Sequence, residues 1–432
     1  MISVSMASWG FGDDAGAVKK VSLATAIQTA LLNNSAIKAA QGGEKSALEN
    51  LKSSRADFLP KATARYSYTH LEDAPYQNVG GIQRTVGDTD NYHWDVTVVQ
   101  PLFTGFSLWS SYGLSKADAE IGRLELEKTV QDVIRDVKTA YFDVLLSERI
   151  QNVAMDKVKT LDAQEKDATS FFDNGIIPKN DLLKSRIARA AAVQELEKAR
   201  ADAMIAMSRL SVIMGDTINA DIVLEQVQPM VADKESMEVL IEEALQNRPE
   251  LRIMAQGLEK FSRNIRLKQS DCYPELSLVG RYEQNGDDPG ATENEFSNDH
   301  NTSVSVQANW TFFEWGKSRA DIAKVRYDQR AFRENIRSME DQVRLEIKQE
   351  YLNLSVREKN IKTAEEALEQ ARENFRITKI QYLQHVTTST EVLDAQSYLS
   401  GAESDYYKAL YGYMIARARL DRAVGRKVVG GD

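Results

Sequence analysis

The sequence predicts a mainly helical chain with a smaller amount of membrane-embedded β-structure. Three observations support this fold class: a duplication that covers most of the chain, two very long stretches without proline, and four short segments in which apolar and polar residues alternate. These features occur in the same order in both copies. The sequence therefore predicts a helix–strand–strand–helix–helix unit that is present twice.

Matching residues of the two copies lie at a nearly constant spacing. Over the later part of each copy the spacing is 210 residues: Tyr141/Tyr351, Phe172/Tyr382, Leu183/Leu393, Arg209/Arg419, Leu210/Leu420 and Gly215/Gly425. Over the earlier part it is 214 residues: Asn33/Asn247, Asp57/Asp271, Pro60/Pro274 and Tyr68/Tyr282. The difference predicts a longer loop in the first copy, between about residues 69 and 95. A repeat this long indicates a duplicated structural unit, since solenoid repeats have periods of about 20–50 residues.

The predicted domain organisation follows the duplication. It consists of an N-terminal tail (1–20), a first repeat (21–215), a linker (216–236), a second repeat (237–425) and a C-terminal tail (426–432). Two interpretations of the N-terminal tail are open. Ser5-Met6-Ala7 is similar to the end of a signal peptide, with cleavage after Ala7, and the alternative is a disordered tail.

Helices are predicted where apolar residues recur at helical spacing without proline. The predicted helices cover residues 22–57, 107–171 and 180–214 in the first copy, and 236–270, 317–382 and 389–424 in the second. Pro60 follows the first helix, and Pro249 interrupts the helix over 236–270. At 1.5 Å per residue, the helices over 107–171 and 317–382 would each extend about 100 Å.

Four strands are predicted from alternation, at about residues 61–70, 92–103, 275–284 and 302–313. Each has about the length that crosses a bilayer when the strand is tilted. Aromatic residues near the strand ends are predicted to form a membrane girdle: Tyr66, Tyr68, Tyr92, Trp94, Tyr282, Trp310 and Phe312. A soluble antiparallel sheet with one wet face fits the alternation equally well. The membrane interpretation is favoured because the chain offers no second apolar sheet to pack against.

Four strands cannot close a barrel, and open strand edges in lipid leave backbone groups without hydrogen bonds. The chain must therefore combine its strands with those of other copies. Two copies would give a plugged eight-stranded barrel, whereas three would give twelve strands and a lumen. We expect a trimeric 12-stranded β-barrel that is continued by a long α-helical barrel.

Composition excludes several other classes of protein. The net charge is −10 with no basic block, which argues against nucleic-acid binding. Cys272 is the only cysteine, so no disulfide forms within the chain and no multi-cysteine metal site is possible. The four histidines (His70, His93, His300 and His385) are scattered, and no phosphate loop or nucleophile elbow occurs. We predict no catalytic residue, no metal, no cofactor and no enzymatic activity.

Several motifs occur in both copies. Pro101-Leu102-Phe103-Thr104-Gly105 matches Thr311-Phe312-Phe313-Glu314-Trp315-Gly316, and Arg209-Leu210…Gly215 matches Arg419-Leu420…Gly425. With Phe172-x-x-Gly175 and Asp181, and with the order of the elements, they resemble the TolC-like outer-membrane efflux proteins (outer membrane factors). The resemblance covers Val21 to Gly425.

The resemblance implies a homotrimeric channel in the cell outer membrane that extends into the periplasm. Its partners would be outer-membrane lipid, a periplasmic adaptor (membrane fusion protein) and an inner-membrane pump. The implied function is the exit duct of a tripartite efflux system, without covalent chemistry. Two alternatives are open: the outer-membrane duct of a type I protein secretion system, or a non-membrane periplasmic coiled-coil scaffold.

Glu391 and Asp394 are the predicted channel constriction. They lie three residues apart at the start of a helix, and hence on one face. They match the acidic constriction of TolC-like channels, with Glu391 in place of an aspartate, and three copies would form two carboxylate rings that favour cations. The alternative is ordinary helix capping, because Thr388-x-x-Glu391 fits a capping box.

The resemblance also implies a gate latch in which Tyr382 binds Asp181 in the closed state. This chain has both residues. An arginine of the family pattern is replaced by Thr387 and a threonine by Asn180, so we expect a weaker gate.

Overall fold

The structure is a computed structural model that describes residues 19–215, 222–227, 235–296 and 298–427. The possible cleavage site after Ala7 and most of the two tails lie outside the described residues. The helices are α1 (Leu23–Asn33), α2 (Ser35–Ala56), α3 (Ser107–Asp173), α4 (Lys179–Met214), α5 (Met237–Asn247), α6 (Pro249–Ser270), α7 (Lys317–Leu383) and α8 (Ser389–Val424). The strands are β1 (Lys19–Val21), β2 (Lys61–His70), β3 (Tyr76–Val79), β4 (Ile82–Thr85), β5 (Asp90–Thr104), β6 (Ile222–Leu224), β7 (Glu275–Gly286) and β8 (His300–Asn309).

The helices of the two halves match in length as well as in order. Both α1 and α5 have 11 residues, α2 and α6 have 22, α3 and α7 have 67, and α4 and α8 have 36. Such equality is what a duplication of one folding unit predicts. Within the described residues, no helix is both long and apolar enough to cross a lipid bilayer.

The single helix predicted over 22–57 is wrong, because Asn34 divides it. The Asn34 side-chain oxygen accepts a hydrogen bond from the Ala36 N–H at 2.8 Å, and its Nδ2 donates to the Ile213 carbonyl at 2.7 Å. The side chain therefore begins α2 and ties it to the end of α4.

Other differences concern short strands. β1 and β6 form a parallel pair within segments predicted as tail and linker. β3 and β4 form a hairpin around Gly80 and Gly81 in the stretch predicted as a longer loop. β8 ends at Asn309, short of the predicted 313, because its partner β7 begins at Glu275 directly opposite Asn309.

The chain forms two compact units, and each unit takes segments from both repeats. Unit 1 comprises residues up to 40, 126–249 and 340 onward, and unit 2 comprises 41–125 and 250–339. Both long helices, α3 and α7, contribute residues to both units. The division by contacts thus differs from the division by sequence repeat.

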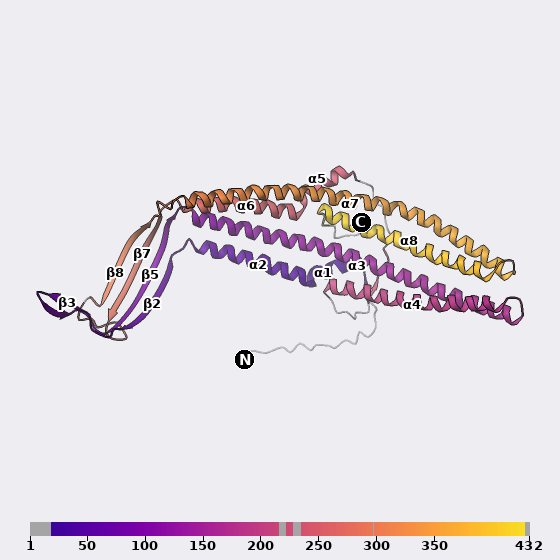
Figure 1. Cartoon of the computed structure of the whole chain (residues 1–432), viewed down its shortest axis with the longest axis horizontal. Helices are drawn as coiled ribbons and strands as arrows, with labels where there is room; N and C mark the ends of the chain where they lie inside the picture. The colour runs from indigo at the N-terminus through magenta and orange to yellow at the C-terminus, as the bar shows by residue number, and fades with distance from the viewer. Residues whose placement is uncertain (1–18, 216–221, 228–234, 297, 428–432) are drawn as a thin grey trace, which may run out of the picture. The chain divides into compact units, whose positions relative to one another are not determined.

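Unit 2 contains an antiparallel four-stranded sheet in the order β2-β5-β7-β8 (Figure 1). Its register brings the four apolar stripes onto one face: Ala64 lies opposite Val96, Val96 opposite Tyr282, and Gly280 opposite Val304. That face is uncovered, since Val304 is 75% and Val306 66% exposed. The other face carries polar residues, and among them Asp95 is buried and accepts a hydrogen bond from Thr97 at 2.7 Å.

Unit 1 has its core on one face of α3. Tyr141 is fully buried, and its hydroxyl lies 2.7 Å from the Glu225 carbonyl oxygen and 3.1 Å from that of Val21. Burial raises the pKa of Tyr141 to about 12, so the phenol stays protonated and donates. One side chain thus ties α3 to β1 and to the segment that follows β6.

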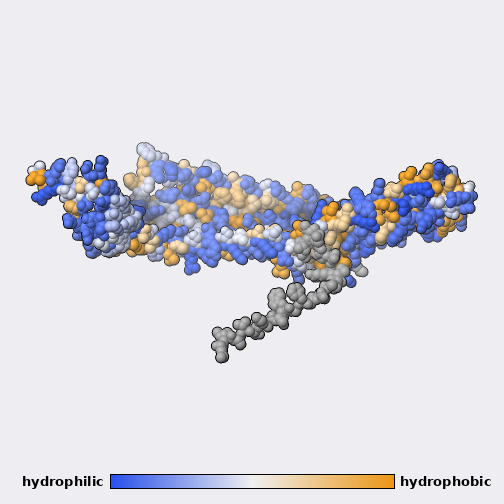
Figure 2. Space-filling view, turned by 90° about the horizontal axis from the view of Figure 1, so that it is seen from below, coloured by the Kyte–Doolittle hydropathy of each residue, from blue (hydrophilic) through white to orange (hydrophobic). Residues whose placement is uncertain are grey.

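Ion pairs join α3 of the first repeat to α8 of the second. Arg422, which is almost completely buried, binds Asp132 at 2.8 Å, and Gln131 donates to the Gly425 carbonyl at 3.1 Å. Away from these contacts, apolar side chains are exposed among polar ones along the helices (Figure 2).

Gly215 and Gly425 end α4 and α8 in a backbone conformation that favours glycine. Each ends its helix with a positive φ, 72° at Gly215 and 89° at Gly425, which costs about 1–2 kcal/mol for other residues. A Cβ at Gly215 would lie 2.6 Å from the Asn33 carbonyl oxygen, whereas at Gly425 the nearest atom is 3.3 Å away. We expect Gly215→Ala to lower the free energy of unfolding by about 2–4 kcal/mol and Gly425→Ala by about 1–2. Guanidinium unfolding followed by circular dichroism measures both, and equal losses would contradict the packing at Asn33.

Candidate functional site

The candidate gate lies at the two turns of unit 1 that join α3 to α4 and α7 to α8 (Figure 1). The turns have matching backbone geometry: Gly175 has a φ of 70°, and His385, which occupies the equivalent position, has a φ of 60°. The His385 ring packs edge-on against Phe171, with the ring centroids 4.6 Å apart. This contact ties the second turn to the end of α3.

Glu391 and Asp394 are both exposed on the first turns of α8. The neighbouring face of the helix, with Val392 and Ala395, is buried. Among the described residues neither carboxylate takes part in an ion pair or a side-chain hydrogen bond. The helix places the two acids side by side and leaves them available to solvent.

The structure contains one of the two hydrogen bonds of a capping box at the start of α8. The Thr388 side chain accepts a hydrogen bond from the Glu391 N–H at 3.4 Å, so Thr388 caps α8. The reciprocal hydrogen bond, from the Thr388 N–H to the Glu391 carboxylate, does not occur among the described residues. Capping by Thr388 and a separate role for the Glu391 carboxylate are therefore compatible.

Tyr382 and Asp181 do not bind each other in the single chain. Tyr382 is buried, and its hydroxyl has no hydrogen-bond partner of good geometry among the described residues. Burial raises its pKa; nearby Ser389 opposes this increase, and the negative charges of Asp167 and Asp181 add to it. Asp181 is close enough to act on the phenol electrostatically, so the latch stays a prediction for the assembled closed state.

Lys184 is a cation of the gate region that the sequence analysis missed. Its Nζ lies 3.5 Å from Asp181 and donates to the Thr390 hydroxyl at 3.0 Å, so it links α4 to α8. Next to it, the hydroxyls of Ser185 and Ser389 are 3.2 Å apart. Asn180 is exposed and Thr387 half-buried, and among the described residues neither has a side-chain hydrogen bond to Tyr382 or Asp181. Lys184 thus supplies a positive charge beside Asp181.

The predicted membrane girdle divides into two groups at opposite ends of the sheet. Tyr68 stacks on Tyr92 with centroids 4.7 Å apart, and Trp94 packs on Tyr282 at 5.4 Å, beside Tyr66. Trp310 and Phe312 lie beyond the end of β8 and are 58% and 80% exposed. Aromatic side chains therefore mark both ends of the apolar face.

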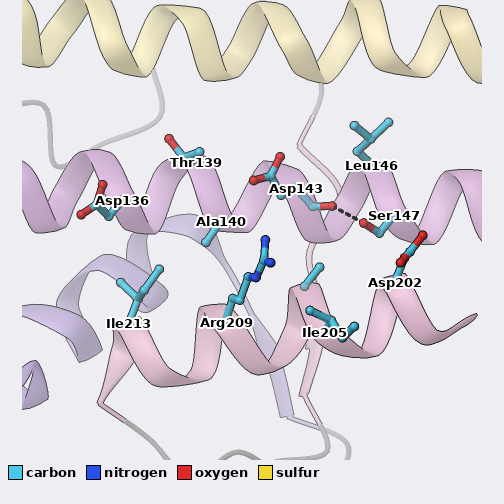
Figure 3. A pocket seen from close by; sticks show the side chains of 11 residues that line it. Asp136, Thr139, Ala140, Asp143, Leu146, Ser147, Asp202, Ile205, Arg209 and Ile213 are labelled. Carbon is cyan, nitrogen blue, oxygen red and sulfur yellow. Dashed lines mark hydrogen bonds between the residues drawn. The ribbon is translucent and has the colours of Figure 1, made fainter. Parts of the chain in front are cut away.

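Unit 1 also contains an open cavity of about 590 Å³ between α3 and α4 (Figure 3). Arg209 rises from α4 toward Asp143 on α3, and Asp136 and Asp202 lie toward the two ends of the cavity. Desolvation by the surrounding side chains raises the pKa of Asp143, and the positive charges of Arg419 and Arg209 oppose the shift. In the described part of the chain, no group of three histidine, cysteine or acidic residues is placed to hold a metal ion.

The chain was compared with known protein families. The model of the family described as "Outer membrane efflux protein" matches residues 26–216 and 240–426. The two matches together cover most of the chain. This chain belongs to the outer membrane efflux protein family.

Individual relatives are distant. The alkaline protease secretion protein AprF of Pseudomonas aeruginosa is 24% identical over 377 residues, which cover 85% of this chain and 76% of AprF. The outer membrane protein TolC of Escherichia coli is 20% identical over 407 residues, covering 92% and 81%. The solved CmeC channel of Campylobacter jejuni superposes with a TM-score of 0.80 at 15% identity, covering 98% and 94%.

These findings confirm the TolC-like fold class and the location in the cell outer membrane, with extension into the periplasm. The family consists of channel proteins, and the non-membrane scaffold is excluded. The comparisons do not test the individual constriction, latch and girdle residues.

The latch can be tested with variants at the turns. One hydrogen bond contributes about 0.5–1.5 kcal/mol, so Asp181→Ala or Tyr382→Phe should each raise the open-to-closed ratio about 2–10-fold for every latch that is lost. Single-channel recordings in planar bilayers measure this ratio. Lys184→Met should raise it as well, while Asp173→Asn, an exposed acid of the same turn, should leave it unchanged. No change in Asp181→Ala would reject the latch.

Proposed function

We propose that three copies of this chain form the exit duct of a tripartite efflux system across the outer membrane, without covalent chemistry. The observation that carries this proposal is the four-stranded sheet of unit 2. One face of it is mainly apolar and is exposed or half-exposed, and the described chain provides no partner for the outer edges of β2 and β8. In lipid the apolar face is stable, but each unpaired backbone group costs several kcal/mol. Pairing β8 of one copy with β2 of the next removes both edges.

The helices of unit 1 support the same head-to-tail contact. Within one chain, α3 packs against α8, and Phe142, Met414 and Ile415 belong to that core. The matching residues on α7 and α4 are exposed: Leu352 by 52%, Met204 by 66% and Ile205 by 50%. The contact made once inside the chain thus has an unoccupied counterpart on its outer surfaces. A head-to-tail interface closes into a ring when its rotation allows.

In such a ring the cavity of Figure 3 faces the bore. Tyr141 and Asp143 are two residues apart, so their side chains leave α3 about 200° apart. Tyr141 lies on the face of α3 that α1 and the β1–β6 pair cover. Because these elements form an added layer on that face, the face would point outward from the ring. Asp143 and Arg209, which line the cavity in Figure 3, would then face the bore.

The partners follow from the family and from the turns. A periplasmic adaptor and an inner-membrane pump would supply recognition and energy to the duct. The turn residues Ile176 and Val386 are 49% and 72% exposed, which offers an adaptor apolar contact at the end of the duct. A second candidate function, protein secretion, is favoured by the similarity to AprF, which is named for secretion of an alkaline protease.

The duct and its acidic constriction can be tested together in planar bilayers. The wild-type protein should form conducting channels that prefer cations and are blocked by divalent cations. Glu391→Gln combined with Asp394→Asn should abolish most of that preference and weaken the block about tenfold.

Thr388→Ala is the matched control. It removes the cap and should lower the stability of α8 by about 1 kcal/mol while leaving ion selectivity unchanged. A wild-type protein that never conducts would contradict the duct. A conducting double variant with unaltered selectivity would contradict only the constriction.

A further inference from the structure

Unit 2 contains an aromatic groove between the end of α2 and the start of α3. It encloses about 650 Å³ and is lined by Lys52, Arg55, Ala56, Phe58, Leu59, Trp109 and Tyr112. The Phe58 ring contacts the rings of both Trp109 and Tyr112 edge-on, with centroids 5.1 Å and 6.2 Å apart. The groove therefore has an apolar aromatic floor and two cationic side chains at its rim.

The cations of this groove are available for a ligand. Arg55 is exposed and takes part in no ion pair among the described residues. Lys52 binds Glu49 at 2.7 Å, its one ion pair among these residues, and both side chains of that pair are about 70% exposed. A surface pair of this kind contributes little and is readily exchanged. An anion could therefore bind both cationic side chains at a small cost in free energy.

The groove lies next to the start of β2, one of the proposed membrane strands. Leu59 is two residues ahead of the first residue of β2, and Gln100 of β5 donates to the Phe58 carbonyl at 3.0 Å. Trp109 and Leu59 are 64% and 61% exposed. Tryptophan beside arginine and lysine is typical of the level at which lipid headgroups meet water.

The second repeat provides an internal comparison. At the positions that match Phe58 and Trp109 it has Cys272 and Arg319, so it lacks the aromatic floor. The fold builds the same helices and strands without these rings. The groove is thus a feature of the first repeat, and the duplicated scaffold does not require it.

We propose that this groove binds an anionic phospholipid of the membrane leaflet from which the helices emerge. The phosphate would bind Arg55 and Lys52, and an acyl chain would lie along Trp109, Phe58 and Leu59. A pocket of this volume with an apolar lining and few polar groups is typical of small-molecule sites. The site depends on the outer-membrane location and is independent of what the duct transports.

Purified full-length protein in detergent can be titrated with dioctanoyl phosphatidylglycerol, dioctanoyl phosphatidylcholine or inorganic phosphate. The shift of the thermal unfolding midpoint gives each affinity. Because each cation near a lipid surface contributes about 1 kcal/mol, phosphatidylglycerol should bind about 30-fold more tightly than phosphatidylcholine. The double variant Lys52→Ala and Arg55→Ala should abolish this difference, and Trp109→Ala should weaken the binding of both lipids.

Arg266→Ala is the matched control, because it removes the cation at the position of Lys52 in the second repeat and should change nothing. Equal affinities for the two lipids, or no effect of the double variant, would overturn the proposal. Phosphate that shifts the midpoint as strongly as phosphatidylglycerol would assign the groove to a free anion. A lower assembly mass in Trp109→Ala would assign it to a second copy of the chain. Conductance of the double variant should be normal in every case, so failure here is distinct from failure of the duct.

Discussion

The unpaired backbone groups along β2 and β8 are the constraint on which the rest of the structure depends. The sheet register collects the apolar residues of four strands on one face, and that arrangement is stable only against lipid or another apolar surface. In lipid, however, the strand edges must be satisfied. The proposed assembly of three copies would satisfy these edges, and the helices would then follow the same symmetry.

The duplication explains how the chain meets that symmetry. Because the helices of the two repeats have equal lengths, the repeats form two similar building blocks. The contact that joins one block to the other, α3 against α8, is already present within one chain. The two repeats have nevertheless diverged. Phe142 is buried where Leu352 is exposed, and the second repeat has Cys272 and Arg319 at the positions of Phe58 and Trp109. Divergence of this kind lets each repeat acquire a separate role.

Much of the fold was predictable because its signals are local. Proline and glycine near element ends and alternation within strands fix most boundaries, and the spacing of Glu391 and Asp394 places both on one face. The misses depend on distant residues. Asn34 breaks a helix through a bond to Ile213, and β1 is only three residues long and pairs with β6 across the chain. Lys184 joins the candidate gate through Thr390, which follows it by 206 residues, a contact that no local pattern reveals.

The proposed trimeric duct depends most directly on the number of chains that complete one barrel. That number is measured most directly as the protein mass of the detergent-solubilised assembly, by light scattering with the detergent contribution subtracted or by native mass spectrometry. We predict that the assembly has the mass of three chains, and hence twelve strands. A monodisperse single chain that remains folded without detergent would contradict it, because the edges of β2 and β8 would then be satisfied without a partner.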